Sequence, residues 1–273
     1  MTKKIIKYFL EKIYRFLSKY FLNKNKIIDE SYHSSDVKLI YPTNFGFYIF
    51  VHKEKLADII TNEESCDSES MMRAFTKIIE NENIAFDVGS NIGITTLWLS
   101  EKIDKVYSFE PDLNNFNAQK ANIKLNNKKN ITQFNIALSD HDGTQEFFVR
   151  KSFGHHGFLE NHTTTDQHKI EVEVKKLDTI LYENGIESID VLKIDVEGFE
   201  EKILYGAKNA LKERRVKKII FEYSPKLLDL NKLDKNSIFK ILDNFDYQFY
   251  NLNLEKIIKF PPDEQTDILA QIK

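Results

Sequence analysis

Acidic residues end several of the short apolar runs in this sequence, and the first of them, Asp87, is followed by a glycine-spaced turn. The segment IAFDVGSNIGITTLWLS, residues 84–100, places Gly89 and Gly93 on either side of Asn91. Gly89 permits a backbone conformation that other residues resist, and Gly93 would let the following helix begin close to the strand. The turn is therefore expected to carry a ligand at the end of a buried strand.

The spacing of this turn matches neither of the common phosphate-binding motifs. It is not GxGxxG, because Asn91 stands where a second glycine belongs, and it is not GxxxxGK[ST], because Ile94 follows Gly93. A neutral or cationic ligand suits an acid-flanked turn better than a phosphate does. S-adenosylmethionine is such a ligand, since it carries an ammonium and a sulfonium group and no phosphate.

The next two apolar runs also end in polar residues. In VYSFEPD, Glu110 directly follows the apolar run and lies 21 residues after the first glycine of the turn. In FNIALSD, the residues after the apolar run are Ser139 and Asp140. A carboxylate at the end of the second strand can accept both hydroxyls of a ribose, in a dinucleotide as well as in S-adenosylmethionine. We expect Ser139 and Asp140 to meet the edge of the adenine. Taken singly, Asp87 is equally explained as a helix N-cap and Glu110 as a solvated acid.

A lysine and three acids gather at the ends of the last two predicted parallel strands. VLKIDVEGFEEK contains Lys193, Asp195 and Glu197, and Glu222 ends IIFEYSP. A lysine in a central strand is costly unless it is paired, and these acids are its obvious partners. The alternative is a buried ion network that caps the helix beginning near residue 198.

These acids also suit methyl transfer. The reaction is an in-line displacement, and a base that takes the proton of an alcohol assists it. Asp195 and Glu222 are the candidate bases, while Glu197 and Lys193 are candidate substrate contacts. Carboxylate oxygens would also suit Mg²⁺, but we expect no metal.

Five of the seven histidines lie between residues 141 and 168. His155 and His156 stand between two glycines in a polar loop, so a mobile lid that supplies a catalytic histidine is one interpretation. A polar surface loop is the other. Their spacing matches no common zinc site, and Cys66 is the only thiol.

The elements that position these residues alternate between short apolar strands and helices. This alternation predicts a parallel sheet with helices on both faces. We expect strands near 84–88, 105–109, 131–136, 189–194 and 218–223, and helices near 92–101, 112–126 and 198–213. Residues 145–149 and 170–174 predict an inserted hairpin within about 145–174, and 247–251 and 267–272 would close the sheet, one of them antiparallel.

The first 65 residues are expected to form an extension to the main domain, residues 66–273. Residues 3–22 have helical spacing of apolar side chains with lysines opposite, which suits packing on protein, including a second copy of the chain, or contact with a membrane surface. Residues 37–52 predict a hairpin, and residues 67–80 predict a helix.

Charge and composition exclude several classes of protein. Residues 1–26 carry a net charge of +7, which leaves −10 for the remainder, so general nucleic-acid binding is not expected. No apolar run approaches 18 residues, and no secretory signal is recognised. With a single cysteine, these features predict a cytoplasmic protein, with peripheral contact at the inner face of the membrane as the alternative for residues 3–22.

Together, FDVGSNIG, SFEPD, NIALSDHDG, VLKIDVEGFEEKILYGA and IIFEYSP resemble the FkbM family of S-adenosylmethionine-dependent methyltransferases over roughly residues 65–273. The segment KIDVEG is the most specific part. The resemblance implies a Rossmann-like, seven-stranded class I methyltransferase fold and methyl transfer, usually to a hydroxyl of a sugar or another small metabolite. It also implies these cofactor contacts: Asp87, Gly89, Asn91, Gly93 and Glu110.

Two other functions stay open at this point. One is nitrogen methylation of a small amine, and the other is a non-catalytic subunit that binds the cofactor and docks a partner. Methylation of a nucleic-acid base is disfavoured, because the fourth strand ends in Asp-Val-Glu-Gly and not in an Asp-Pro-Pro-Tyr motif. We therefore expect a small-molecule or glycan acceptor and no nucleic acid.

Overall fold

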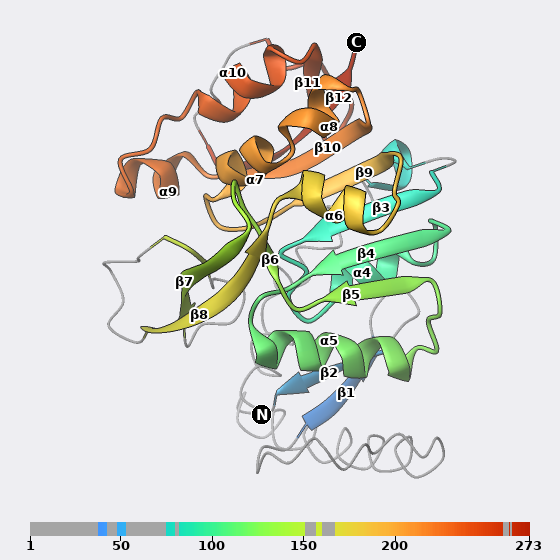
Figure 1. The fold of residues 1–273 in the computed structure, drawn as a ribbon. Coiled ribbons are helices and arrows are strands. Elements are labelled where there is room, and N and C mark those ends of the chain that lie inside the picture. Colours follow the sequence, from blue (N-terminus) through green and yellow to red (C-terminus); the bar gives the residue numbers. More distant parts are fainter. Residues whose placement is uncertain are drawn as a thin grey trace, which may run out of the picture.

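The computed structural model describes residues 38–42, 48–52, 75–79, 82–150, 157–159, 167–258, 262 and 264–273 (Figure 1). The predicted helix at 3–22, both loop histidines, His155 and His156, and the predicted domain boundary at 65/66 lie outside these residues. Of the helix predicted at 67–80, residues 75–78 are described and are helical.

A seven-stranded sheet forms the centre of the structure, as the resemblance predicts. Its order is β11-β12-β10-β9-β3-β4-β5. Strand β12 is antiparallel to both of its neighbours, and the remaining pairs are parallel. The strands are β3 (Ile84–Val88), β4 (Lys105–Phe109), β5 (Ile131–Phe134), β9 (Ile189–Ile194), β10 (Val216–Tyr223), β11 (Tyr247–Asn251) and β12 (Thr266–Ile272).

The chain changes direction across the sheet at β3. It proceeds from β3 through β4 to β5 and then returns to place β9 on the other side of β3. In sheets of this kind, ligands bind in the crevice outside the carboxyl ends of the strands at the reversal point. The register pairs Asp87 with Lys193 there, so the glycine turn and the KIDVEG segment meet at the same edge.

Helices cover both faces of the sheet, as predicted (Figure 1). Alternate residues of β3 point to opposite faces: Ala85 packs with α4 (Ile94–Leu99) and α5 (Leu113–Leu125), and Phe86 packs with the helices of the other face. Those helices are α6 (Leu177–Glu183), α7 (Glu200–Gly206), α8 (Lys208–Lys212) and α10 (Ser237–Asp243). A further helix, α9 (Pro225–Leu230), follows β10.

The single helix predicted over 198–213 is wrong, because the segment forms two helices that meet at Ala207. Gly206 lies directly against the backbone that follows β6, where an added Cβ would be 2.0 Å from the carbonyl oxygen of Ser139. Glycine is also a weak helix former. The close approach therefore coincides with the break between α7 and α8.

The predicted inserted hairpin is confirmed as β7 (Gly143–Arg150) and β8 (Gln167–Lys175), which pair antiparallel. A short strand, β6 (Ala137–Leu138), pairs parallel with β8, so the hairpin belongs to a separate three-stranded sheet. The hairpin predicted at 37–52 is also confirmed in its strands, β1 (Lys38–Pro42) and β2 (Tyr48–His52), which lie beside α5 (Figure 1). None of the helices in the described part of the chain is long and apolar enough to cross a membrane.

Candidate active site

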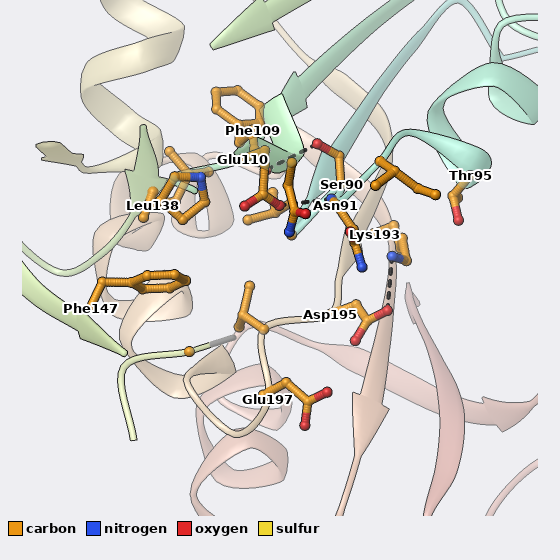
Figure 2. A pocket seen from close by; sticks show the side chains of 18 of the residues that line it. Ser90, Asn91, Thr95, Phe109, Glu110, Leu138, Phe147, Lys193, Asp195 and Glu197 are labelled. Carbon is orange, nitrogen blue, oxygen red and sulfur yellow. Dashed lines mark hydrogen bonds and ion pairs between the residues drawn. The ribbon is translucent and has the colours of Figure 1, made fainter. Parts of the chain in front are cut away.

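A cavity of about 240 Å³ opens at the carboxyl ends of β3, β4 and β9 (Figure 2). Phe147 and Leu138 lie on one side of it, and Lys193 and Asp195 lie on the other. It is lined by Val88–Ile92, Ile94, Thr95, Phe109–Pro111, Asn115, Ala137, Leu138, Phe147, Gly157, Phe158, Lys193 and Asp195–Glu197. The cavity thus joins the glycine turn, the second strand end and the KIDVEG segment.

The glycine turn forms one wall of the cavity. Gly89 has a φ of 77°, and an added Cβ would lie 1.9 Å from the carbonyl oxygen of Asp195. Asn91 has a φ of 50°, and its side-chain oxygen is buried with no hydrogen-bond partner. A buried acceptor without a partner is costly, so the turn is suited to a ligand that donates a hydrogen bond there.

We expect Gly89→Ala to lower the free energy of unfolding and to abolish binding of S-adenosylhomocysteine. The new methyl group would collide with backbone, in addition to the cost of about 1–2 kcal/mol for an L-residue in the left-handed region. Gly185→Ala is the matched control, because Gly185 has a φ of 61° with no atom within 4 Å of an added Cβ. Urea unfolding and calorimetric titration measure both effects. If the two variants lose equal stability and both still bind S-adenosylhomocysteine as the wild type does, Gly89 is not part of the cofactor site.

Gly93 serves a different purpose from the one predicted. It does not line the cavity, and an added Cβ would lie 2.5 Å from the side chain of Gln119 on α5. The residue therefore allows the start of α4 to approach α5, and not the strand. Its φ of 88° at the N-cap of α4 is a second reason for glycine.

Asp87 lies beneath the turn and does not line the cavity. It is fully buried, accepts a hydrogen bond of 2.5 Å from the Thr96 hydroxyl, and has its other oxygen 3.5 Å from Lys193 Nζ. Gln119 donates to the same hydroxyl. The position of Asp87 therefore does not support direct contact with a ligand in this cavity. Asp87 is not the N-cap of α4 either, because Gly93 occupies that position.

Glu110 lines the cavity from the end of β4 and is only 4% exposed. Its two oxygens accept hydrogen bonds from the backbone N–H of Asn91 (2.8 Å) and of Asp112 (2.9 Å). Burial raises the pKa of the Glu110 carboxyl to about 8, against the lowering effect of these two bonds. The two bonds hold both oxygens of the carboxyl group in place at the wall of the cavity, as a bidentate acceptor requires.

A second buried carboxyl, Glu200 at the start of α7, also has a pKa of about 8, raised by burial. Both acids are ionised at neutral pH in the unfolded chain and protonated in the folded one. Their contribution to stability is therefore present below about pH 4.5 and is lost as the pH rises through about 8.

We expect the ligand-free protein to lose about 2 kcal/mol of unfolding free energy for each of Glu110 and Glu200 between pH 6 and pH 8. Urea unfolding at both pH values measures this change. Glu110→Gln and Glu200→Gln mimic the protonated acid, so each should flatten the pH dependence by its own share. If neither substitution alters how steeply the unfolding free energy falls with pH, Glu110 and Glu200 are not the groups responsible.

Ser139 and Asp140 do not line the cavity, so the structure does not support their predicted contact with adenine. Ser139 is fully buried, and Asp140 is bonded to Lys202 (2.7 Å) and His141 (2.9 Å). Burial raises the pKa of Asp140, but the bonds to His141 and Lys202 outweigh it and lower the pKa to about 2. Ala137 and Leu138 of β6 line the cavity instead, and the lining stops before Ser139.

Lys193 lines the cavity but is held by two acids. Its ammonium group is 3.0 Å from Asp195 Oδ2 and 3.5 Å from Asp87 Oδ1, and the residue is 5% exposed. Burial lowers the pKa of Lys193, but the two carboxylates outweigh burial and raise it above its usual value. The lysine therefore stays charged and links the acid beneath the turn to the acid in the cavity.

Three acids gather at the edge of the cavity beyond β9 and β10. Asp195 and Glu197 line it (Figure 2). Glu222 does not line it, although it lies close enough to repel both. One oxygen of Glu222 accepts a hydrogen bond from Gln265. Burial, followed by repulsion from Asp195 and Glu197, raises the pKa of Glu222 to about 7. In the described part of the chain, neither these acids nor any other group of three or more His, Cys, Asp or Glu side chains is arranged so that it could hold a metal ion.

Three comparisons with known proteins bear on this site. A family model described as the methyltransferase FkbM domain matches residues 87–249, which is more than half of the chain. The 2-O-methyltransferase NoeI of Sinorhizobium fredii is 27% identical over 217 residues, covering 73% of this chain and 84% of that protein. Methyltransferase 1 of Beauveria bassiana is 26% identical over 146 residues, covering 46% of this chain and 59% of that protein.

Among solved structures, the Streptococcus mutans protein SMU.1697c, in complex with S-adenosylhomocysteine, aligns with a TM-score of 0.44 and 11% identity. That alignment covers 74% of this chain and 96% of the other. Trm5b from Pyrococcus abyssi aligns with a TM-score of 0.45 and 11% identity, covering 87% of this chain and 56% of the other.

Proposed function

This chain belongs to the FkbM family of methyltransferases, which use S-adenosylmethionine, and we propose that it methylates a hydroxyl of a sugar, a glycan or a glycan precursor. The observation that carries the proposal is a single cavity with a buried bidentate acid, Glu110, on one side and Asp195 with Glu197 on another. The similarity to a protein named a 2-O-methyltransferase supports oxygen as the acceptor atom.

The cofactor half of the cavity consists of Gly89, Asn91, Glu110 and the apolar surface of Leu138 and Phe147. Glu110 accepts hydrogen bonds from the ribose hydroxyls, and Asn91 accepts one through its unpartnered oxygen. Leu138 and Phe147 pack on the adenine ring in place of the predicted Ser139 and Asp140. When bound, S-adenosylmethionine supplies an electrophilic methyl group.

The acceptor half is the acidic edge of the cavity. Asp195 takes the proton of the acceptor hydroxyl while the C–O bond forms and the C–S bond of the cofactor breaks, leaving S-adenosylhomocysteine and a methyl ether. Lys193 holds the Asp195 carboxylate in place. Glu197 accepts a hydrogen bond from a neighbouring hydroxyl of the acceptor, and Glu222 receives the proton from Asp195 for release to solvent.

The experiment that tests this function is a screen with isotope-labelled S-adenosylmethionine against nucleotide sugars and surface glycans, read by mass spectrometry. We expect the label on at least one carbohydrate and on no nucleic acid. Label found only on small amines would favour nitrogen methylation instead. An enzyme that binds S-adenosylhomocysteine but labels no carbohydrate and no amine would support a non-catalytic subunit.

A further inference from the structure

The turn of residues 195–198, here called the acceptor-side turn, connects β9 to α7 and carries both carboxylates of the acidic edge that line the cavity. Its backbone is strained: Glu197 has a φ of 57° and Gly198 a φ of 91°. A side chain other than glycine in this conformation costs about 1 kcal/mol or more. Surrounding contacts must therefore hold the turn in shape.

One end of the acceptor-side turn is fixed by the sheet. The backbone N–H of Asp195 donates to the carbonyl of Val88 at 3.1 Å, and Gly89 packs directly on the Asp195 carbonyl. These contacts tie the start of the turn to the cofactor half of the cavity. They involve Asp195 and Val196 and not Glu197 or Gly198, where the left-handed conformations occur.

The other end of the turn is held by the side chain of Glu200. Its Oε1 accepts hydrogen bonds from the backbone N–H of Gly198 (3.1 Å) and of Val196 (3.3 Å). Glu200 is 2% exposed and does not line the cavity, so it cannot act on a ligand there directly. Its two bonds bracket Glu197 on both sides along the chain.

Two residues of the segment between β7 and β8, Phe158 and Leu159, reinforce the same turn. Phe158 lies with its ring centre 4.3 Å from that of Phe199, and the Leu159 side chain occupies the space beside Gly198. An apolar wall therefore closes over the turn and shields the Glu200 carboxyl from water. Hydrogen bonds made in such a setting are stronger than those exposed to solvent.

We propose that Glu200 is a positioning residue, which sets the direction of Asp195 and Glu197 by bonding the backbone on both sides of Glu197. The inference rests on the proposed acceptor half of the active site and extends it to a residue outside the cavity. Glu200 acts through the turn and touches neither cofactor nor acceptor.

Three substitutions separate this role from a general contribution to stability. Glu200→Gln keeps a carbonyl oxygen that can accept both N–H groups, so it should hold the turn as the wild type does. Glu200→Met keeps the length and burial of the side chain but removes the acceptor. Glu201→Ala is the control, because Glu201 neighbours Glu200 on α7 and interacts with Tyr205 and not with the turn.

Two measurements report on the turn without needing an acceptor. Hydrogen–deuterium exchange of residues 195–199 should be about tenfold faster or more in Glu200→Met. The preference for S-adenosylmethionine over S-adenosylhomocysteine, taken as a ratio of dissociation constants, reports on carboxylates near the positive sulfonium and should fall about fivefold. Affinity for S-adenosylhomocysteine, which lacks the sulfonium charge, should stay within about twofold.

Glu200→Gln and Glu201→Ala should leave the exchange rate and the ratio unchanged. Slow exchange and an unchanged ratio in Glu200→Met would overturn the proposal, as would fast exchange in Glu200→Gln. If Glu200→Met does not fold, Glu200→Ala provides the same comparison. Failure of the glycan screen would leave both readouts intact, whereas loss of S-adenosylhomocysteine binding in the wild type would count against the cofactor site itself.

Discussion

Replacing Glu110 by alanine is expected to weaken binding of S-adenosylhomocysteine about 100-fold or more. Above about pH 8, where the Glu110 carboxyl is ionised, two hydrogen bonds from ribose hydroxyls to this charged acceptor are worth about 1.5–3 kcal/mol each, and 2.7 kcal/mol corresponds to a factor of about 100. The substitution also frees the backbone N–H groups of Asn91 and Asp112, which the carboxylate now fixes. Isothermal titration calorimetry measures the change directly.

Glu101→Ala is the control for the loss of an acid in this part of the chain. Glu101 is exposed, lies just after α4 and pairs with Lys128, away from the cavity. Its removal should leave the dissociation constant unchanged. Binding by Glu110→Ala within about threefold of the wild type would remove Glu110 from the cofactor site.

The second large effect is expected on turnover and not on binding. Asp195→Asn should lower kcat by about 100-fold or more, within the range of general base catalysis, while the dissociation constant of S-adenosylhomocysteine stays within about threefold. Asparagine keeps the shape of the side chain and an oxygen that can accept from Lys193, but it cannot take a proton. Steady-state rates on an acceptor identified by the screen, combined with calorimetry, separate the two quantities.

Asp104→Asn provides the matched control, because Asp104 is an exposed acid in the loop before β4. It should retain full turnover. If Asp195→Asn also retains full turnover, Asp195 has a structural role as the partner of Lys193, and the base must be sought elsewhere along the acidic edge.

The sequence predicted the central sheet well because buried parallel strands appear as short apolar runs. The strands from 84–88 to 189–194 and the inserted hairpin lie where these runs indicate. Helices α6, α9 and α10 were missed. Each presents barely two turns of periodicity, as α4 and α7 do, but no glycine turn or KIDVEG segment marks where it begins. Their placement depends on packing against the sheet.

The candidate site was predictable where it depends on strand ends. Glu110, Asn91, Lys193 and Asp195 come together because parallel strands present their carboxyl ends at one edge. The separate short strand β6 was not predictable from the sequence, so Ser139 was assigned to the cavity in place of Ala137 and Leu138.

Two roles could be seen only from the three-dimensional contacts. Gly93 matters through its approach to Gln119 on α5, a residue 26 positions further along the chain. Glu200 matters because it accepts hydrogen bonds from backbone N–H groups of the acceptor-side turn. In the sequence, its position two residues after Gly198 was the one signal of this role. Neither relation follows from periodicity or from the chemistry of the residue alone.

The most direct test of the proposed chemistry is to find the atom that receives the methyl group. The enzyme would be incubated with S-adenosylmethionine carrying a ¹³C-methyl group and the carbohydrate that the screen identifies, and the product would be examined by NMR. The methyl carbon is expected on an oxygen of a sugar, as a methyl ether. A methyl carbon bonded to nitrogen, or one that stays on the cofactor with every carbohydrate tested, would contradict sugar O-methylation.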